Sequence, residues 1–263
     1  MKINKIYNED CLETMARMPD NFVDLVVTSP PYDNLRDYNG YEFNFEEIAQ
    51  ELFRVTKQGG VLVWVVADAT INGSEIGTSF KQALYFKGLG ANLYDTMIYE
   101  KNGTPFPTEG RYYNLWEYMF IISKGKPKTI NLIKDRLNKW PAGPFGHKTT
   151  YNKDGTKRKH KKYSSDLYGV RFNIWKYNVG FHPQNNKNPH PAVFPEKLAK
   201  DHIYSWSNEN DLIYDPMMGS GTVAKAALQL DRNYIGSEIS KEYCAIAEKR
   251  ISIYKSQYKL QLQ

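Results

Sequence analysis

Short apolar runs alternate with amphipathic stretches along most of the chain. Val23–Val27 and Val61–Ala67 are β-branched runs of strand length, which is typical of strands buried on both faces of a parallel sheet. Between them, residues 45–55 place Ile48 and Leu52 on one face at helical spacing. The first third of the chain therefore predicts the strand–helix alternation of a doubly wound α/β sheet.

The same patterns predict further elements toward both ends of the chain. Helices are predicted at Leu12–Met18, Gly77–Gly88, Glu196–Trp206, Val223–Leu230 and from Lys241 to about Tyr254. Strands are predicted at Lys5–Asp10, Leu93–Glu100, Trp116–Ile122, Val170–Tyr177, Asp211–Asp215 and Asn233–Gly236. In the helix Gly77–Gly88 we expect Phe80, Leu84 and Tyr85 to face the core. We expect Ser240 to cap the last helix.

Periodicity fades between residues 125 and 189, where Pro, Gly, Asn and Lys accumulate. We interpret this region as an insertion with a small fold of its own, or as an element that becomes ordered on binding. The remaining residues, 1–124 and 190–263, are then two halves of one α/β domain.

The positive charge of the chain is concentrated inside this insertion. His147–Lys162 holds seven Lys or Arg residues and one acid, Asp154. Removing the segment from the totals of 35 basic and 29 acidic residues leaves 28 of each, so one block carries the whole net charge of +6. Such a block is typical of contact with a polyanion, although a solvated loop has the same composition.

Bulk properties narrow the class of protein. No apolar run approaches the length of a membrane helix, and the N-terminus has no apolar signal segment. The chain has only two cysteines, Cys11 and Cys244, so we expect no disulfide framework and a cytoplasmic location. His147 and His160 lack metal-ligand spacing, and we predict no metal site.

Thr28-Ser29-Pro30-Pro31-Tyr32 ends the first buried strand. Two successive prolines offer no N–H to a sheet and restrict φ, so the chain must leave as a stiff turn. In open α/β sheets, ligands bind at the carboxyl ends of strands. A hydroxyl, free carbonyls and an aromatic ring at this position suit a flat, amine-bearing group. The alternative is a proline-terminated strand with a packing tyrosine.

A second motif, Asp215-Pro216-Met217-Met218-Gly219-Ser220-Gly221-Thr222, lies between a predicted strand and a predicted helix. Glu238 ends the next strand, at the spacing where a carboxylate meets ribose hydroxyls in nucleotide-binding βαβ units. The turn has neither the G-x-G-x-x-G pattern nor the Gly-Lys-Ser/Thr of a P-loop. Two acids suit a ligand with a ribose and an ammonium group, and S-adenosylmethionine has both.

Together these motifs resemble those of the amino-methylating DNA methyltransferases, which modify adenine N6 or cytosine N4. The order resembles their permuted β-class, in which the catalytic S/D/N-P-P-Y motif comes first and the cofactor motif last. Asp215–Thr222 resembles the family's Asp-Pro-Phe-x-Gly-Ser-Gly-Thr, with Met217 in place of Phe. Asn8-Glu9-Asp10-Cys11 resembles its Gly-Asp-Cys turn near the cofactor adenine. His190–Leu198 resembles its His-Pro element beside the methionine moiety.

The resemblance implies a Rossmann-like methyltransferase sheet and a mechanism. The target base is flipped out of duplex DNA and stacks on Tyr32, while Ser29 and the Pro30 carbonyl accept hydrogen bonds from its amine. Rigid acceptors stabilise the positive charge that develops on nitrogen. Methyl transfer is direct, so Cys11 is expected to pack near the cofactor rather than to attack the base. Ser29 favours cytosine N4, and adenine N6 is the alternative.

The resemblance also implies three sets of site residues. The catalytic set is Ser29, Pro30, Pro31 and Tyr32. The cofactor set is Asp10, Cys11, Thr28, Phe194, Asp215, Pro216, Met217, Gly219, Ser220, Gly221, Thr222 and Glu238. The insertion falls where the family places its target-recognition region, and its basic block supplies the DNA-contacting residues Lys148, Lys157, Arg158, Lys159, Lys161 and Lys162. Arg36, on the loop after the proline turn, is added to this set as a residue that could hold a phosphate, with a plain surface charge as the alternative.

Two other classes of function remain open on these residues. One is a methyltransferase-like DNA-binding module without catalysis, against which the intact motifs argue. The other is a methyltransferase that acts on RNA or protein, which the order of the motifs and the insertion disfavour. The expected partner is double-stranded DNA in a restriction–modification or phage context. That context allows a homodimer and a cognate restriction endonuclease as further partners.

Overall fold

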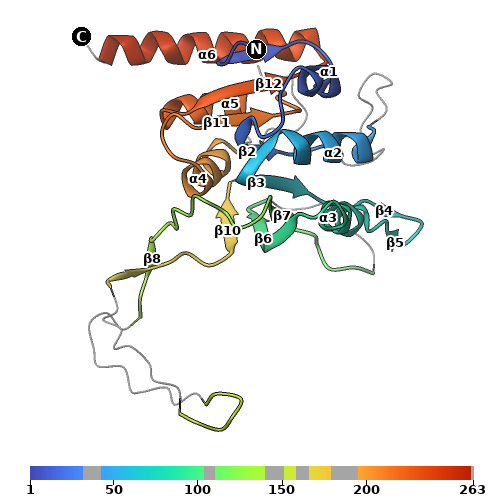
Figure 1. Ribbon diagram of the computed structural model, residues 1–263, viewed down its shortest axis with the longest axis vertical. Helices are drawn as coiled ribbons and strands as arrows, with labels where there is room; N and C mark the ends of the chain where they lie inside the picture. Colours follow the sequence, from blue (N-terminus) through green and yellow to red (C-terminus); the bar gives the residue numbers. More distant parts are fainter. Residues whose placement is uncertain (32–42, 104–109, 140–150, 158–165, 179–194, 262–263) are drawn as a thin grey trace. The chain divides into compact units, whose positions relative to one another are not determined.

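The computed structural model describes residues 1–31, 43–103, 110–139, 151–157, 166–178 and 195–261 (Figure 1). The chain forms two compact units. One unit combines Met1–Asn131 with Asn173–Gln263, and the other is Leu132–Phe172. The first unit is a sheet covered by helices on both faces.

The first unit is built on an 8-stranded sheet in the order β1-β12-β11-β2-β3-β7-β6-β10. All neighbouring strands are parallel except β7, which runs antiparallel to both β3 and β6. No helix lies in the described part of the connection from β6 to β7, so β7 returns beside β6 as in a hairpin. The strand bounds are β1 Lys5–Tyr7, β2 Val23–Thr28, β3 Thr56–Val66, β6 Asn92–Lys101, β7 Trp116–Ser123, β10 Ile174–Tyr177, β11 Leu212–Asp215 and β12 Asn233–Ser237.

The register of these strands brings the two sequence motifs to one edge. Tyr7 of β1 is level with Ser237 of β12, and Asp215 of β11 is level with Gly236. On the other side of β11, Tyr214 pairs with Val26 of β2. The carboxyl ends of β1, β12, β11 and β2 therefore meet at the same edge of the sheet, where α/β folds bind ligands.

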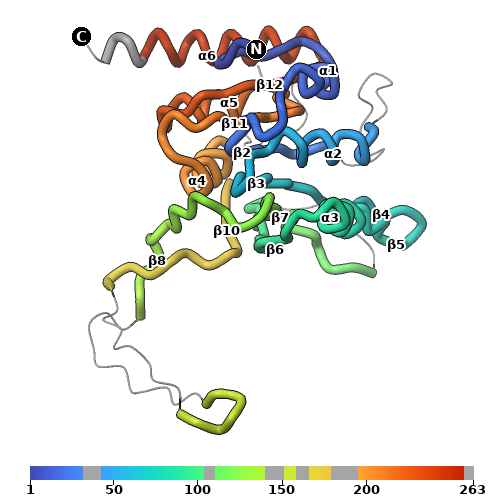
Figure 2. Tube along the Cα trace, in the orientation of Figure 1, coloured from blue at the N-terminus to red at the C-terminus, as the bar shows by residue number. Residues whose placement is uncertain are grey.

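In the described part of the chain, six helices lie against this sheet, and their bounds are α1 Cys11–Ala16, α2 Phe45–Val55, α3 Thr78–Gly88, α4 Glu196–Trp206, α5 Thr222–Gln229 and α6 Lys241–Gln261. Buried residues of α1, α2 and α3 share a core with one face of the sheet, whereas α4 and α5 pack together on the other (Figure 1). Figure 2 shows the N-terminal strand beside the C-terminal helix, and α6 contacts β1. The fold is thus doubly wound, as predicted.

The predicted inner face of α3 is wrong for Phe80 and Leu84, which are 49% and 64% exposed. The helix instead buries Gln82 and Phe86. Trp64 of β3 donates its indole N–H to the Gln82 side chain at 2.8 Å, and its ring packs edge-on against Phe86. A buried indole N–H needs a partner, so this polar contact decides which face of α3 turns inward.

The second unit is smaller than the insertion predicted at 125–189. It contains a short antiparallel ladder of β8 (Arg136–Leu137) and β9 (Tyr168–Gly169). The strand predicted at Val170–Tyr177 begins only at Ile174. That strand, β10, pairs with β6 and belongs to the main sheet. The main unit also carries a hairpin of β4 (Thr70–Ile71) and β5 (Ser74–Glu75).

Other predicted bounds agree closely with the structure. The helices predicted at 45–55 and 196–206 have those bounds. Ser240 caps α6 as predicted, because its hydroxyl accepts a hydrogen bond from the Tyr243 N–H at 3.3 Å. The helix itself continues past Tyr254 to Gln261. No helix among the described residues has the length and apolar character that crossing a membrane requires.

The α3 correction can be tested with two leucine truncations. Leu52 of α2 is fully buried, so Leu52→Ala should lower the free energy of unfolding by about 2–5 kcal/mol. Leu84→Ala removes the same atoms from an exposed position and should change it by less than about 0.5 kcal/mol. Urea unfolding followed by circular dichroism measures both values. A loss of stability in Leu84→Ala equal to that in Leu52→Ala would restore the predicted inner face.

Candidate active site

A buried hydrogen bond joins the two motifs. The Thr28 hydroxyl at the end of β2 donates to Asp215 Oδ1 at the end of β11, over 2.9 Å. Both side chains are buried, and they are 187 residues apart in the sequence. The same oxygen of Asp215 accepts the Met217 N–H at 3.0 Å, which closes the turn that follows β11. The proline turn and the glycine turn therefore begin from one shared contact.

The environment of Asp215 changes its acidity. Burial, with a smaller contribution from the nearby Glu238 carboxylate, outweighs the lowering effect of the two hydrogen bonds and raises the pKa of Asp215 to about 7. Among the described residues both hydrogen bonds to the Asp215 side chain reach Oδ1, and none reaches Oδ2. An acid in this state favours a cationic partner, because a nearby positive charge stabilises its ionised form.

Glu238, just after β12, holds the glycine turn to the next strand. Its Oε2 accepts the Gly219 N–H and its Oε1 accepts the Ser240 N–H, each at 2.8 Å. The side chain is 9% exposed, and burial raises its pKa. The carboxylate is thus fixed in orientation, and its remaining acceptor capacity can bind hydroxyl groups.

The glycine turn has a backbone that only glycine adopts easily. Gly219 and Gly221 have φ values of 51° and 81°. The Gly221 N–H donates to the Met218 carbonyl at 2.9 Å, and the Met218 N–H donates to the Ser237 carbonyl at 2.8 Å. A Cβ on Gly221 would lie 2.7 Å from the Cβ of Ala247 on α6. The turn is therefore held by both β12 and α6.

The turn after β1 completes this edge of the sheet. Asp10 caps α1 by accepting the Leu12 N–H at 2.7 Å. The Asn8 side chain donates to the Glu238 carbonyl at 2.8 Å, which ties β1 to the end of β12. Burial raises the pKa of the Cys11 thiol to about 12. A thiol that stays protonated is a poor nucleophile, in agreement with the predicted packing role.

The structure describes most, but not all, of the predicted site residues. Ser29, Pro30 and Pro31 follow β2, and Pro216, Met217, Ser220 and Thr222 lie in the glycine turn. Lys157 is exposed and lies in the second unit, where its backbone forms an isolated antiparallel β-bridge with Tyr151. Eight predicted site residues lie outside the described residues: Tyr32, Arg36, Lys148, Arg158, Lys159, Lys161, Lys162 and Phe194.

Three residues that sequence reasoning did not assign to the site contact its turns. The Asn8 side chain donates to the Glu238 carbonyl, and the Ser240 backbone N–H donates to the Glu238 carboxylate. Arg250 of α6 donates to the Ser220 carbonyl at 2.6 Å. Asn8 stands in the turn whose Asp10 was chosen, so its position was a usable signal. No sequence signal indicated Arg250, because it lies in a helix that carries no motif.

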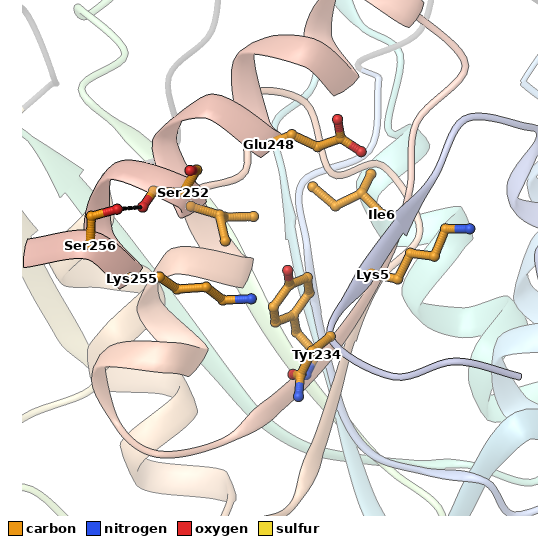
Figure 3. Close-up of a pocket in the computed structure, with 9 residues that line it drawn as sticks. Lys5, Ile6, Tyr234, Glu248, Ser252, Lys255 and Ser256 are labelled. Atoms are coloured by element: carbon orange, nitrogen blue, oxygen red, sulfur yellow. Dashed lines mark hydrogen bonds between the residues drawn. The ribbon is translucent and has the colours of Figure 1, made fainter. Parts of the chain in front are cut away.

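A separate hollow of about 410 Å³ lies at the amino ends of β1 and β12, under α6 (Figure 3). Lys5 and Lys255 lie on either side of the Tyr234 ring, with Glu248 above it (Figure 3). The hollow is away from the edge that carries both motifs, and we do not assign it to the site. Within the described ranges, no three His, Cys, Asp or Glu side chains gather as metal ligands would.

Comparison with known proteins identifies the family. The family model of the N6/N4 DNA methylases matches residues 23–249. The chain belongs to this DNA methylase family. It is 61% identical, over 89% of its length and 91% of the relative's, to the orphan methyltransferase M.BamHII of Bacillus amyloliquefaciens. It is 28% identical over 95% of its length to the type II methyltransferase M.BglII of Bacillus subtilis, covering 69% of that protein.

Solved structures of DNA methyltransferases share the fold. The M1.HpyAVI–SAM complex aligns with 94% of this chain and 98% of its own, with a TM-score of 0.59 and 25% identity. The cytosine-N4-specific PvuII methyltransferase aligns with 96% of this chain and 91% of its own, with a TM-score of 0.67 and 19% identity. The predicted family, enzyme class and Rossmann-like fold are confirmed.

Two glycine substitutions test how the DNA methylase's glycine turn is supported. Gly221→Ala and Gly90→Ala both place a Cβ on a residue of positive φ, which costs about 1–2 kcal/mol. Only at Gly221 does the Cβ also meet another helix, so Gly221→Ala should cost about 1–3 kcal/mol more. Thermal unfolding measures the difference. Equal losses of stability in the two variants would mean that the contact with α6 does not constrain the turn.

Proposed function

We propose that the protein transfers a methyl group from S-adenosylmethionine to the exocyclic amine of a base flipped out of double-stranded DNA, with cytosine N4 as the target. The observation that carries this proposal is the buried Thr28–Asp215 hydrogen bond. The contact brings the start of the proline turn, at Thr28, beside the turn that would hold the cofactor. Donor and acceptor are then positioned by one rigid frame, which is the main requirement for direct transfer.

The donor set at this edge fits S-adenosylmethionine. Asp215 would bind the ammonium of the methionine moiety through Oδ2, and Glu238 would accept hydrogen bonds from the ribose hydroxyls. Asp10 and Cys11 lie at the turn predicted to meet the adenine. The cofactor supplies an electrophilic methyl group on a sulfonium. Support comes from the M1.HpyAVI–SAM complex, with 25% identity over nearly the whole chain.

The catalytic turn would act on the amine by accepting its hydrogen bonds. The lone pair of an aromatic amine is delocalised into the ring, so the nitrogen is a weak nucleophile. The Ser29 hydroxyl and the Pro30 carbonyl would favour a pyramidal nitrogen and stabilise the positive charge that develops on it. Pro30 and Pro31 hold these acceptors rigid. Stacking of the base on Tyr32 stays a prediction.

Ser29 is the reason for preferring cytosine N4 over adenine N6. In the family that these motifs resemble, Ser-Pro-Pro-Tyr goes mostly with cytosine N4. Asp or Asn at that position goes mostly with adenine N6. The PvuII methyltransferase is cytosine-N4-specific but shares only the fold with this chain. The two amines have similar geometry, so the choice between them is made by experiment below.

We assign target recognition to the second unit, Leu132–Phe172, and to the basic residues of the insertion. Its described part exposes large apolar side chains, including Leu137 and Phe172, at 62% and 67%. A short ladder with outward apolar side chains buries little core of its own and suits a surface that closes on a ligand. Lys157 is exposed there and available to phosphates. A homodimer and a cognate endonuclease stay predictions.

Expression in a host that lacks DNA methylation tests the function. Nucleoside mass spectrometry of the host DNA should find N4-methylcytosine with the unchanged protein. Ser29→Ala should lower the rate at least about a hundredfold, because one acceptor of the developing charge is lost. Ser252→Ala, on the exposed surface of α6, is the matched control and should methylate normally.

The same measurement decides the rival functions. N6-methyladenine in place of N4-methylcytosine would overturn the cytosine assignment. Absence of any modified base, in a protein that binds S-adenosylmethionine, would leave a binding module without catalysis. If host RNA, measured in the same way, carries the modified nucleoside and host DNA does not, the protein is an RNA methyltransferase.

The raised pKa of Asp215, about 7, predicts how cofactor affinity depends on pH. Only the ionised carboxylate attracts an ammonium, and the ionised fraction grows as pH rises toward 7. Affinity for S-adenosylmethionine should therefore increase about tenfold between pH 5.5 and 7, below the range in which the cofactor's α-amino group titrates. Titration calorimetry measures it. Asp215→Asn should bind weakly with a smaller pH dependence, and a flat profile for the unchanged protein would refute the role.

A further inference from the structure

One face of α6 lies along the glycine turn and along Glu238 at the end of β12. Cys244 is 3.8 Å from the Glu238 carbonyl through its sulfur, and Ala247 faces Gly221. Arg250 reaches Ser220. These three positions of α6 are three residues apart, the spacing that places side chains on one helix face. The helix therefore supports Glu238 and the glycine turn at the same time.

Arg250 makes its contacts through one terminal nitrogen. Nη1 is 2.6 Å from the Ser220 carbonyl oxygen and 2.9 Å from the Ser220 hydroxyl oxygen. The Thr222 hydroxyl is farther, at 3.4 Å. Ser220 and Thr222 are only 5% and 4% exposed, so a carbonyl left here without a donor would be costly. The guanidinium replaces the water that this buried carbonyl would otherwise need.

These contacts determine the orientation of one peptide plane. The carbonyl of Ser220 and the N–H of Gly221 belong to the same planar peptide and point in opposite directions. The carbonyl is held by Arg250, and the N–H is held by the Met218 carbonyl at 2.9 Å. With both ends bound the plane cannot rotate, although glycine at position 221 would otherwise allow it.

The Glu196 carboxylate offsets part of the cost of burying the charge of Arg250. Burial lowers the pKa of its guanidinium and the Glu196 carboxylate raises it, and arginine remains protonated at neutral pH. Glu196 begins α4 and binds Lys225 and Gln229 of α5, at 2.8 and 2.9 Å. Helices α4, α5 and α6 thus meet in one polar cluster beside the turn. Of these four side chains only Glu196 lies in a motif named above, His190–Leu198.

We propose that Arg250 is a positioning residue of the cofactor site. It fixes the Ser220–Gly221 peptide, and through it the Gly219 N–H that orients Glu238. This inference rests on the proposed function, because the turn matters for binding only if the protein binds S-adenosylmethionine. Arg250 contacts neither Ser29 nor Asp215 in any described interaction, so it acts on cofactor binding and not on the methyl-transfer step.

The test compares Arg250→Met, Arg250→Lys and Lys249→Met in the full-length protein. Lys249 is the exposed neighbour on the same helix, so Lys249→Met removes an equal charge without touching the turn. Arg250→Met should raise the Kd and the KM for S-adenosylmethionine about tenfold to a hundredfold, the effect of losing a charged hydrogen bond to a buried acceptor. The kcat at saturating cofactor should stay within about threefold.

Arg250→Lys should lie between Arg250→Met and the unchanged protein, because an ammonium donates to the carbonyl but lacks the planar fork. Lys249→Met should match the unchanged protein. If Arg250→Met does not fold, the increase in Kd of Arg250→Lys decides the question. An unchanged Kd in the folded variants, with only a lower melting temperature, would overturn the proposal. Failure of the unchanged protein to bind S-adenosylmethionine would instead overturn the proposed function.

Discussion

The hydrogen bond between Thr28 and Asp215 is the contact on which the site depends. It forms because β2 and β11 are parallel neighbours whose carboxyl ends are level. Loss of either partner would leave a polar atom buried without a partner, which costs about 1–3 kcal/mol. The bond also joins two turns with different chemistry, one built from prolines and one from glycines. The stiffness of the first and the tight backbone of the second have one common origin in the sheet.

The acids at this edge are costly to hold in a cofactor-free protein. Burial raises the pKa of both Asp215 and Glu238, so each is less stable as an anion than in water. Their hydrogen bonds offset part of this cost and set their directions. A ligand with a cation and hydroxyl groups would offset more of it. The site is thus preorganised for its ligand at the expense of stability, a pattern common at functional sites.

Much of the fold followed from periodicity, and the failures have physical causes. The helices at 45–55 and 196–206 were predicted at their observed bounds, because each carries a clear buried face. The inner face of α3 was predicted wrongly, since Gln82 and Phe86, and not Phe80 and Leu84, turn toward the core at Trp64. The strand after the insertion starts later than predicted, since only Ile174–Tyr177 reaches β6. Such outcomes depend on partners remote in sequence.

The sequence by itself determined the local chemistry. Proline pairs stop a strand, glycines allow a tight turn, and acids at the ends of two strands predict a cationic, hydroxyl-bearing ligand. Only the tertiary structure decided how these parts act together. It set the 2.9 Å contact across 187 residues, the raised pKa of Asp215, and the approach of Arg250 to Ser220. The reason is that burial and long-range hydrogen bonds depend on which elements pack together, and no local pattern contains that information.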